Sequence, residues 1–417
     1  MECGGLPPLF RHLKLPLRGF VKHLAILGST GSIGRQCLSV VESLAGRFGV
    51  VALAAGGNLE ELAGQIKKHK PEVVSVGDSN RVDELVAMLR EKGVARLPAI
   101  HSGREGMLAV GTHSKADIVV SAAVGVVGLE ATYEAVKLGK IVALSNKEVL
   151  VAAGELVMAA AQKAGRELLP VDSEHNAVHQ CLRGGTRGEV RRLLLTASGG
   201  PFRKTPLAAL SNVTPEQALA HPNWRMGNRI TIDSATMMNK GFEIIEARWL
   251  FGVRPDQIDV VVHPQSTIHS MVEFVDGSVL AQLGPTDMRM PIQYALTYPE
   301  RATSNNEIAL DWRKLKRLDF EKASTRRFPC LRLAREAMKK GGAFPCALNA
   351  ADEIAVAAFL ERRLGFLGIP EVIERVLIRT PRVRFERMDD VLTADAEARR
   401  MAREEVEKLA VTAAAAS

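Results

Sequence analysis

The triplet Asp172-Ser173-Glu174 places two carboxylates close together after an apolar run. On an extended segment, side chains two residues apart point to the same side, so both carboxylates would face one way. Neighbouring anions raise each other's pKa unless a cation lies between them, and oxygen ligands suit Mg2+ or Mn2+. His175 and His179, a helical turn apart, could instead indicate a zinc site. The triplet could also simply begin a helix, with Asp172 or Ser173 as its N-cap.

A second group of reactive side chains lies in the segment 232–243, which we expect to run from a strand into a helix. Ser234, Asn239 and Lys240 could hold a phosphate, because hydroxyl and amide donors fix its geometry and an ammonium group neutralises it. Glu243 would supply a third oxygen ligand to the metal. These types of side chain predict a site for a metal and a phosphorylated substrate.

Two loops could complete that site. The small residues of 196–200, among them Ser198, would let the backbone approach an anion closely. The polar segment 220–229 is expected to be neither strand nor helix, yet it carries Trp224 and Met226. An aromatic ring and a thioether in a polar loop suggest a flap that closes over a ligand.

A glycine-rich turn, 28–34, follows an apolar run and precedes a helical pattern. Glycines allow close approach of a pyrophosphate, and a helix N-terminus attracts its charge, although the spacing is GxxGxxG rather than GxGxxG. The second apolar run, 50–55, ends in Gly56-Gly57-Asn58 without the carboxylate that usually binds the ribose 2′-hydroxyl of NAD. This favours NADP, unless the three residues are merely a tight turn.

The elements that must position these groups divide the chain into regions. Apolar runs alternating with amphipathic helices over 23–165 predict a Rossmann-like, doubly wound parallel sheet that binds NADPH. The pattern then changes to an α+β catalytic domain, 166–297, followed by a charged linker, 298–327. Four helical segments in 328–417 predict a small bundle. Residues 1–22 are expected to be a loose extension rather than a transit peptide.

Composition excludes several classes of protein. The 417 residues carry a net charge of +8, but only 5% of them are aromatic. No stretch interleaves cations with stacking rings, so we expect no nucleic-acid partner. The longest uncharged apolar stretch, 118–129, falls short of the ~20 residues needed to cross a bilayer. Five scattered cysteines without a CxxC pair indicate a reducing compartment.

Together these residues resemble one family, 1-deoxy-D-xylulose 5-phosphate reductoisomerase of the non-mevalonate isoprenoid route. The resemblance covers about 23–410. Its motifs are GSTGSIG at 28–34, SNKE at 145–148, DSEHNA at 172–177, TASGG at 196–200, HPNWRMG at 221–227, IDSATMMNKGFE at 232–243 and HPQS at 263–266.

The resemblance implies a role for each matching residue. The NADPH contacts would be Thr30, Gly31, Ser32, Ile33, Gly56, Gly57, Asn58, Asn146, Glu148 and Gly227. The metal ligands would be Asp172, Glu174 and Glu243. The substrate contacts would be Lys147, Ser173, Glu174, Ser198, His221, Trp224, Met226, Ser234, Asn239, Lys240 and Glu243. Lys147, Glu174 and Glu243 would be catalytic.

The resemblance further implies an NADPH-dependent enzyme that uses Mg2+, Mn2+ or Co2+, a cytoplasmic location and a homodimer. Its reaction would be a skeletal rearrangement of 1-deoxy-D-xylulose 5-phosphate followed by hydride reduction to 2-C-methyl-D-erythritol 4-phosphate. Position 57 is basic in some relatives but glycine here, so the resemblance supplies no cation for the 2′-phosphate. The alternatives are another NADP-dependent dehydrogenase sharing only the nucleotide domain, and a non-catalytic binding protein.

Overall fold

A seven-stranded parallel sheet is built from the first part of the chain. The computed structural model describes residues 21–220, 226–303 and 308–416, with side chains to 411. The strands follow the order β4-β3-β2-β1-β5-β6-β7. Their bounds are β1 Lys22–Leu27, β2 Phe48–Ala54, β3 Val73–Val76, β4 Ala99–Ser102, β5 Ile118–Ser121, β6 Ile141–Leu144 and β7 Leu168–Pro170. The strand order reverses between β1 and β5, and in doubly wound sheets ligands bind at the carboxyl ends of strands beside such a point.

Helices cover both faces of this sheet, which explains its continuous apolar strands. On β1, Leu24 and Ile26 face one buried cluster while Ala25 and Leu27 face another. Helices α1, α2, α3 and α11 contribute to the first cluster, and α4, α5 and α6 to the second. Their bounds are α1 Ser32–Ser43, α2 Leu59–His69, α3 Val82–Glu91, α4 Gly103–Gly111, α5 Leu129–Lys137, α6 Glu148–Ala164 and α11 Arg289–Thr297. The expected Rossmann-like fold is confirmed.

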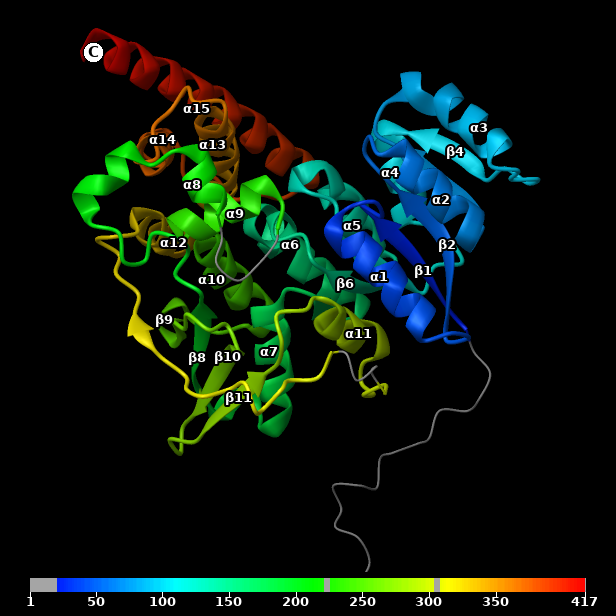
Figure 1. Cartoon of the computed structure of the whole chain (residues 1–417), viewed down its shortest axis with the longest axis horizontal. Coiled ribbons are helices and arrows are strands. Elements are labelled where there is room, and N and C mark those ends of the chain that lie inside the picture. Colours follow the sequence, from blue (N-terminus) through cyan, green and yellow to red (C-terminus); the bar gives the residue numbers. More distant parts are fainter. Residues whose placement is uncertain (1–20, 221–225, 304–307, 417) are drawn as a thin grey trace, which may run out of the picture.

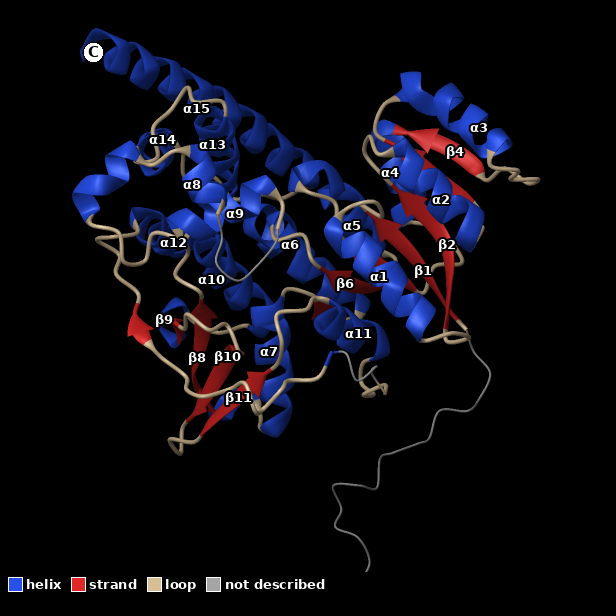
Figure 2. Ribbon diagram, viewed as in Figure 1, coloured by secondary structure: helices blue, strands red, loops and turns tan. Residues whose placement is uncertain are grey.

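A second, mixed sheet of five strands lies at the lower left of Figures 1 and 2, away from the first sheet. Its order is β11-β10-β8-β9-β12, with β8 Val190–Ala197, β9 Ile258–Val262, β10 Ile268–Phe274, β11 Val279–Leu283 and β12 Glu321–Lys322. The last of these strands lies within the expected linker. Helix α7, Ser173–Cys181, packs on β10 and β11 and also contacts α11, so it connects the two sheets.

The segment 232–243 does not run from a strand into a helix, and that expectation is wrong. Two helices occupy it, α9 Asn228–Thr236 and α10 Met238–Phe251. They are separated at Met237, whose φ of 63° is left-handed. The short helix α8, Pro215–Leu219, precedes the expected flap, and residues 221–225 lie outside the described part of the chain.

The C-terminal helices form the predicted helical region, with α12 Pro329–Lys340, α13 Ala343–Leu360, α14 Gly368–Arg379 and α15 Met388–Ala416. Helix α13 is the centre of this group and contacts α12, α14, α15 and α6. It is long and apolar enough to cross a membrane by composition, but 78% of it is buried inside the protein, as expected for a core helix. Figure 1 shows α15 extending along the outside of this group.

Candidate active site

A cavity of about 990 Å3 lies between the two sheets. Its wall is formed largely by the segments that follow β1, β5, β6 and β7 in the first sheet, together with the segment after β8 in the second. Helices α9 and α10 close another side. The carboxyl ends of parallel strands meet at one edge of a sheet, so the fold brings these distant motifs together.

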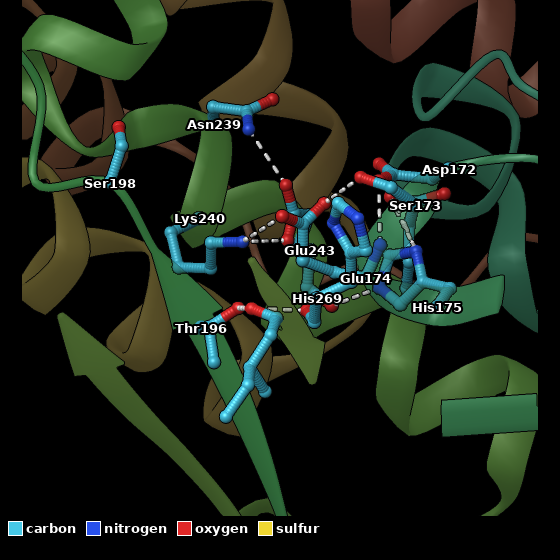
Figure 3. Close-up of polar contacts among 12 residues, drawn as sticks. Asp172, Ser173, Glu174, His175, Thr196, Ser198, Asn239, Lys240, Glu243 and His269 are labelled. Carbon is cyan, nitrogen blue, oxygen red and sulfur yellow. Dashed lines mark hydrogen bonds and ion pairs between the residues drawn. The ribbon is translucent and has the colours of Figure 1, made fainter. Parts of the chain in front are cut away.

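The three predicted metal ligands converge in this cavity. Carboxylate oxygens of Asp172, Glu174 and Glu243 all lie within 4.8 Å of one another (Figure 3). Asp172 is the N-cap of α7, Glu174 lies in the first turn of that helix, and Glu243 is fully buried on α10. The extended geometry expected for the triplet is therefore wrong, since Ser173 begins a helix. Asp172 both caps the helix and belongs to the acidic cluster. As the N-cap, its Oδ1 accepts the Glu174 N–H at 3.4 Å.

Two lysines lie among these carboxylates. Lys147 forms an ion pair with Asp172, and its Nζ is 3.7 Å from Glu243 Oε1. Lys240 forms an ion pair with Glu243, and its Nζ is 3.7 Å from Glu174 Oε1. Three carboxylates against two ammonium groups leave one net negative charge when all are ionised. A buried site with excess negative charge and only oxygen donors suits a hard divalent cation.

The lysines also control the protonation of the carboxylates. Burial opposes ionisation of Glu174, but Lys240 and other positive neighbours hold its pKa below the usual value. Burial outweighs the same lysine at Glu243 and raises its pKa. A cation that displaced Lys240 from these oxygens would therefore also favour ionisation of Glu243.

The two histidines do not form a zinc pair. His175 is buried, with Nε2 2.9 Å from the Glu243 carbonyl oxygen, and burial lowers its pKa to about 3. It could join a second acidic cluster with Asp172 and Glu246, but neither His175 nor Glu246 lines the cavity. His179 lies elsewhere, against the Tyr294 hydroxyl and Glu167, each at 2.9 Å.

The predicted phosphate-binding groups also gather at the cavity. Its lining includes Ser198, Ser234, Asn239 and Lys240, and also Ser173, which the resemblance gives as a substrate contact. Asn239 donates from Nδ2 to Glu243 Oε1 at 2.7 Å, so the amide group joins the anion site to the carboxylates. The segment after β8 reaches α9 because position 200 is glycine: a Cβ there would lie 2.7 Å from the Ser234 carbonyl oxygen.

The predicted nucleotide contacts fall into two groups. Six of them line the cavity: Gly31, Ser32, Ile33, Asn146, Glu148 and Gly227. The other four lie outside its lining: Thr30, Gly56, Gly57 and Asn58. Gly28 and Ser29 donate their backbone N–H groups to the Ala54 carbonyl at 2.9 and 2.8 Å, so the turns after β1 and β2 are adjacent. A dinucleotide could therefore extend from the cavity across both turns.

Of the expected flap, Met226 and Gly227 line the cavity, whereas His221 and Trp224 lie outside the described residues. The end of the predicted segment is wrong, since α9 begins at Asn228. Sequence reasoning missed Arg229, which donates from Nη1 to Glu148 Oε1 at 2.8 Å. Its position in the expected flap segment, 220–229, was the available signal, but the partner is 81 residues away.

Three sequence models of one family match consecutive parts of the chain. They are 1-deoxy-D-xylulose 5-phosphate reductoisomerase over 24–154, the C-terminal domain of that enzyme over 168–251, and the DXP reductoisomerase C-terminal domain over 283–401.

Curated relatives extend this similarity over most of the chain. The 1-deoxy-D-xylulose 5-phosphate reductoisomerase of Solibacter usitatus is 53% identical over 92% of this chain and 97% of its own. The protein of the same name from Symbiobacterium thermophilum is 52% identical over 92% and 98%.

Solved structures are equally similar. The Zymomonas mobilis reductoisomerase in complex with NADPH has a TM-score of 0.87 and 43% identity, covering 94% of this chain and all of that one. A DOX-P reductoisomerase in complex with NADPH, fosmidomycin and magnesium has a TM-score of 0.86 and 37% identity, covering 93% and 98%.

Proposed function

The chain belongs to the 1-deoxy-D-xylulose 5-phosphate reductoisomerase family, and we infer that the cavity between its two sheets is the active site. The enzyme uses NADPH and a divalent metal to convert 1-deoxy-D-xylulose 5-phosphate to 2-C-methyl-D-erythritol 4-phosphate, by rearrangement of the carbon skeleton and reduction of the resulting aldehyde. The observation that carries the assignment of the site is the convergence of Asp172, Glu174 and Glu243 beside the nucleotide-binding turn.

The residues fit both the metal and the nucleotide. Asp172, Glu174 and Glu243 would hold the metal, because the cluster offers only oxygen donors and its excess negative charge favours a hard cation such as Mg2+, Mn2+ or Co2+. The metal supplies Lewis-acid polarisation of substrate oxygens, and NADPH supplies the hydride. The start of α1 suits a pyrophosphate. Its N-cap is Gly31, so no side chain caps the backbone N–H groups that would bind the anion.

The protein's own side chains orient the substrate and hold protons. Lys240, Asn239, Ser234 and Ser198 would bind the phosphate, a group that does not itself react, so that its binding energy supports alignment of the reacting carbons. Lys147 lies between Asp172 and Glu243, where its ammonium group could donate to a substrate oxygen. Ser173 donates from its hydroxyl to Glu174 Oε2 at 2.7 Å and fixes that carboxylate. We assign catalytic roles to Lys147, Glu174 and Glu243, and the family resemblance adds His221, Trp224 and Met226 to the substrate contacts.

The alternative dehydrogenase, sharing only the nucleotide domain, is not favoured. The matched relatives span the catalytic and C-terminal regions as well, and a simple hydride transfer would not require three clustered carboxylates in the same cavity.

An assay of NADPH oxidation with 1-deoxy-D-xylulose 5-phosphate tests the metal site. We expect turnover with Mg2+ or Mn2+, and none after EDTA treatment. Glu243→Gln should abolish nearly all activity and weaken Mn2+ binding, measured by electron paramagnetic resonance, by more than about 100-fold because it removes a charged ligand. Glu91→Gln, at the exposed end of α3, is the matched control. Full rates with EDTA, or unchanged Mn2+ affinity in Glu243→Gln, would contradict the assignment.

We also propose that the enzyme is a homodimer that associates through β11. This strand is an edge of the second sheet, and Val279 and Leu280 are 46% and 40% exposed on it. An exposed apolar edge strand is a template for pairing with another chain. Light scattering after size-exclusion chromatography should give twice the chain mass. Leu280→Lys should shift the mass towards the monomer, whereas Ile378→Lys, at a more exposed apolar site on α14, should not. A wild-type monomer at all concentrations would contradict this proposal.

The cytoplasm is the location that we propose. Cys37, Cys181, Cys330 and Cys346 are all buried free thiols, as expected in a reducing compartment. Cell fractionation followed by immunoblotting should recover the protein with cytoplasmic markers; recovery with membranes would contradict the proposal.

A further inference from the structure

The turn after β2, formed by Gly56, Gly57 and Asn58, lies beside the segment that follows β3. These strands are neighbours in the sheet, and the Gly77 N–H donates to the Gly56 carbonyl oxygen at 3.1 Å. Arg81, on the β3 side, donates from Nη1 to the Gly57 carbonyl oxygen at 2.6 Å. The guanidinium group is thus fixed against the turn at the carboxyl end of the second strand.

Position 57 leaves room for this arrangement. A Cβ on Gly57 would lie 3.3 Å from Arg81 Nη1, so a side chain there would crowd the guanidinium group. The neighbouring Asn58 side chain is already engaged, because its Oδ1 caps α2 by accepting the Glu61 N–H at 3.1 Å. The turn itself therefore carries no charge, and Arg81 brings a positive charge to it from another element.

Glu84 determines the orientation of Arg81. Arg81 Nε and Nη2 donate to the two oxygens of Glu84 at 2.8 and 2.9 Å. Arginine has five N–H donors. Glu84 and Gly57 use three of them, so two remain for a ligand. The side chain is 36% exposed, which makes those two donors accessible. Asp78, also nearby, is occupied as the cap of the short helix before α3, accepting the Asn80 N–H at 2.9 Å.

In a doubly wound sheet, the ribose of the adenosine half of a dinucleotide lies at the carboxyl end of the second strand. A carboxylate there selects NAD, and an arginine nearby accommodates the 2′-phosphate of NADP. We propose that Arg81 binds the 2′-phosphate of NADPH and is the residue that makes this enzyme prefer NADPH over NADH. The proposal rests on the NADPH-dependent function given above.

Equilibrium binding of cofactors and their fragments tests this role without any measurement of turnover. Isothermal titration calorimetry would compare NADPH with NADH, and adenosine 2′,5′-bisphosphate with adenosine 5′-monophosphate, for the wild type and Arg81→Ala. We expect Arg81→Ala to weaken binding of NADPH and of the bisphosphate by about 10- to 100-fold, the factor for one charge-assisted contact. Binding of NADH should change by less than about twofold, since it has no phosphate at this position.

Two further variants separate charge from structure. Arg90→Ala removes an exposed arginine from α3, the helix that follows Arg81, and should leave all four affinities unchanged. Gly57→Lys in the Arg81→Ala background should restore part of the preference for NADPH, because φ at position 57 is not left-handed and the space beside it is then open. Salt should weaken the binding of NADPH to the wild type more than to Arg81→Ala.

Three results would overturn the inference. Unchanged NADPH affinity in Arg81→Ala would exclude a contact with the 2′-phosphate. Equal losses for NADPH and NADH would show that Arg81 only supports the turn. A wild-type chain that binds NADPH no better than NADH would leave no preference to explain, and would at the same time refute the assignment of NADPH as the cofactor. The first two results leave that assignment standing, so failure of this inference and failure of the proposed function are distinguishable.

Discussion

Lys240 belongs both to the proposed metal site and to the proposed phosphate site. It forms an ion pair with the proposed metal ligand Glu243, yet it lines the cavity beside the serines and the amide group expected to bind phosphate. Without a cation at the carboxylates, the lysine compensates their charge. When a divalent cation takes over that role, the ammonium group becomes available to an anion. Metal and sugar phosphate should therefore bind with positive coupling.

Lys240→Ala removes this cation. We expect KM for the sugar phosphate to rise, or kcat/KM to fall, by about 10- to 100-fold, because one charge-assisted contact is worth about 1.5–3 kcal/mol. Steady-state kinetics at saturating Mg2+ measure the effect, and Lys339→Ala, at the exposed end of α12, serves as control. If neither kinetic parameter changed, Lys240 would not belong to the phosphate site.

At the level of elements, the first sheet could be predicted because its strands are apolar on both faces. Strands β3, 73–76, and β6, 141–144, are two of the apolar runs that alternate with helices over 23–165. Helix α6, in contrast, was not predicted. Its residues are apolar around most of the helix, since it packs against α5, α10 and α13 at once, and such a helix lacks the amphipathic period that reveals a surface helix.

The backbone conformation of the active site could be predicted less well than the identity of its residues. The break between α9 and α10 occurs at Met237 in a left-handed conformation, which glycine or asparagine would normally signal and methionine does not. The three carboxylates could be named from their motifs because the resemblance covered all of them. The contact between Arg81 and Gly57 could not be predicted, because helix α2 and strand β3 lie between these two residues in the chain.

Across the whole molecule, Arg229 connects the active site to the C-terminal helices. From α9 it donates to Glu148 at the start of α6, to Glu353 on α13 at 3.2 Å and to Asn349 at 2.9 Å. Arg399 on α15 donates to the same Glu353 at 2.8 Å. The network therefore joins the nucleotide-binding region, the helix after the expected flap and the bundle through paired charges that are only partly exposed.

Two buried carboxyl groups give this network its pH dependence. Burial raises the pKa of Asp352 to about 6, with Arg229 opposing the shift, and burial together with Asp352 raises the pKa of Asp233 well above its usual value. Each group keeps its proton in the folded state at a pH where the unfolded chain has lost it. The contribution of these two groups to the free energy of unfolding should therefore be constant below about pH 4. It should fall as pH rises through about 4 to 6 for Asp352, and further for Asp233, by at most about 1.4 kcal/mol per pH unit for each group.

Asp233→Asn replaces the protonated carboxyl by an amide of the same shape that cannot ionise. We expect the melting temperature of this variant, relative to the wild type, to rise as the pH increases above about 4, because only the wild type must either keep a proton or bury a second charge beside Asp352. Thermal unfolding of the metal-free chain, followed by circular dichroism, measures the difference at each pH. Asp83→Asn, at an exposed site on α3, should give a curve parallel to that of the wild type. A parallel curve for Asp233→Asn as well would mean that Asp233 is ionised in the folded protein and that Arg229 compensates both aspartates.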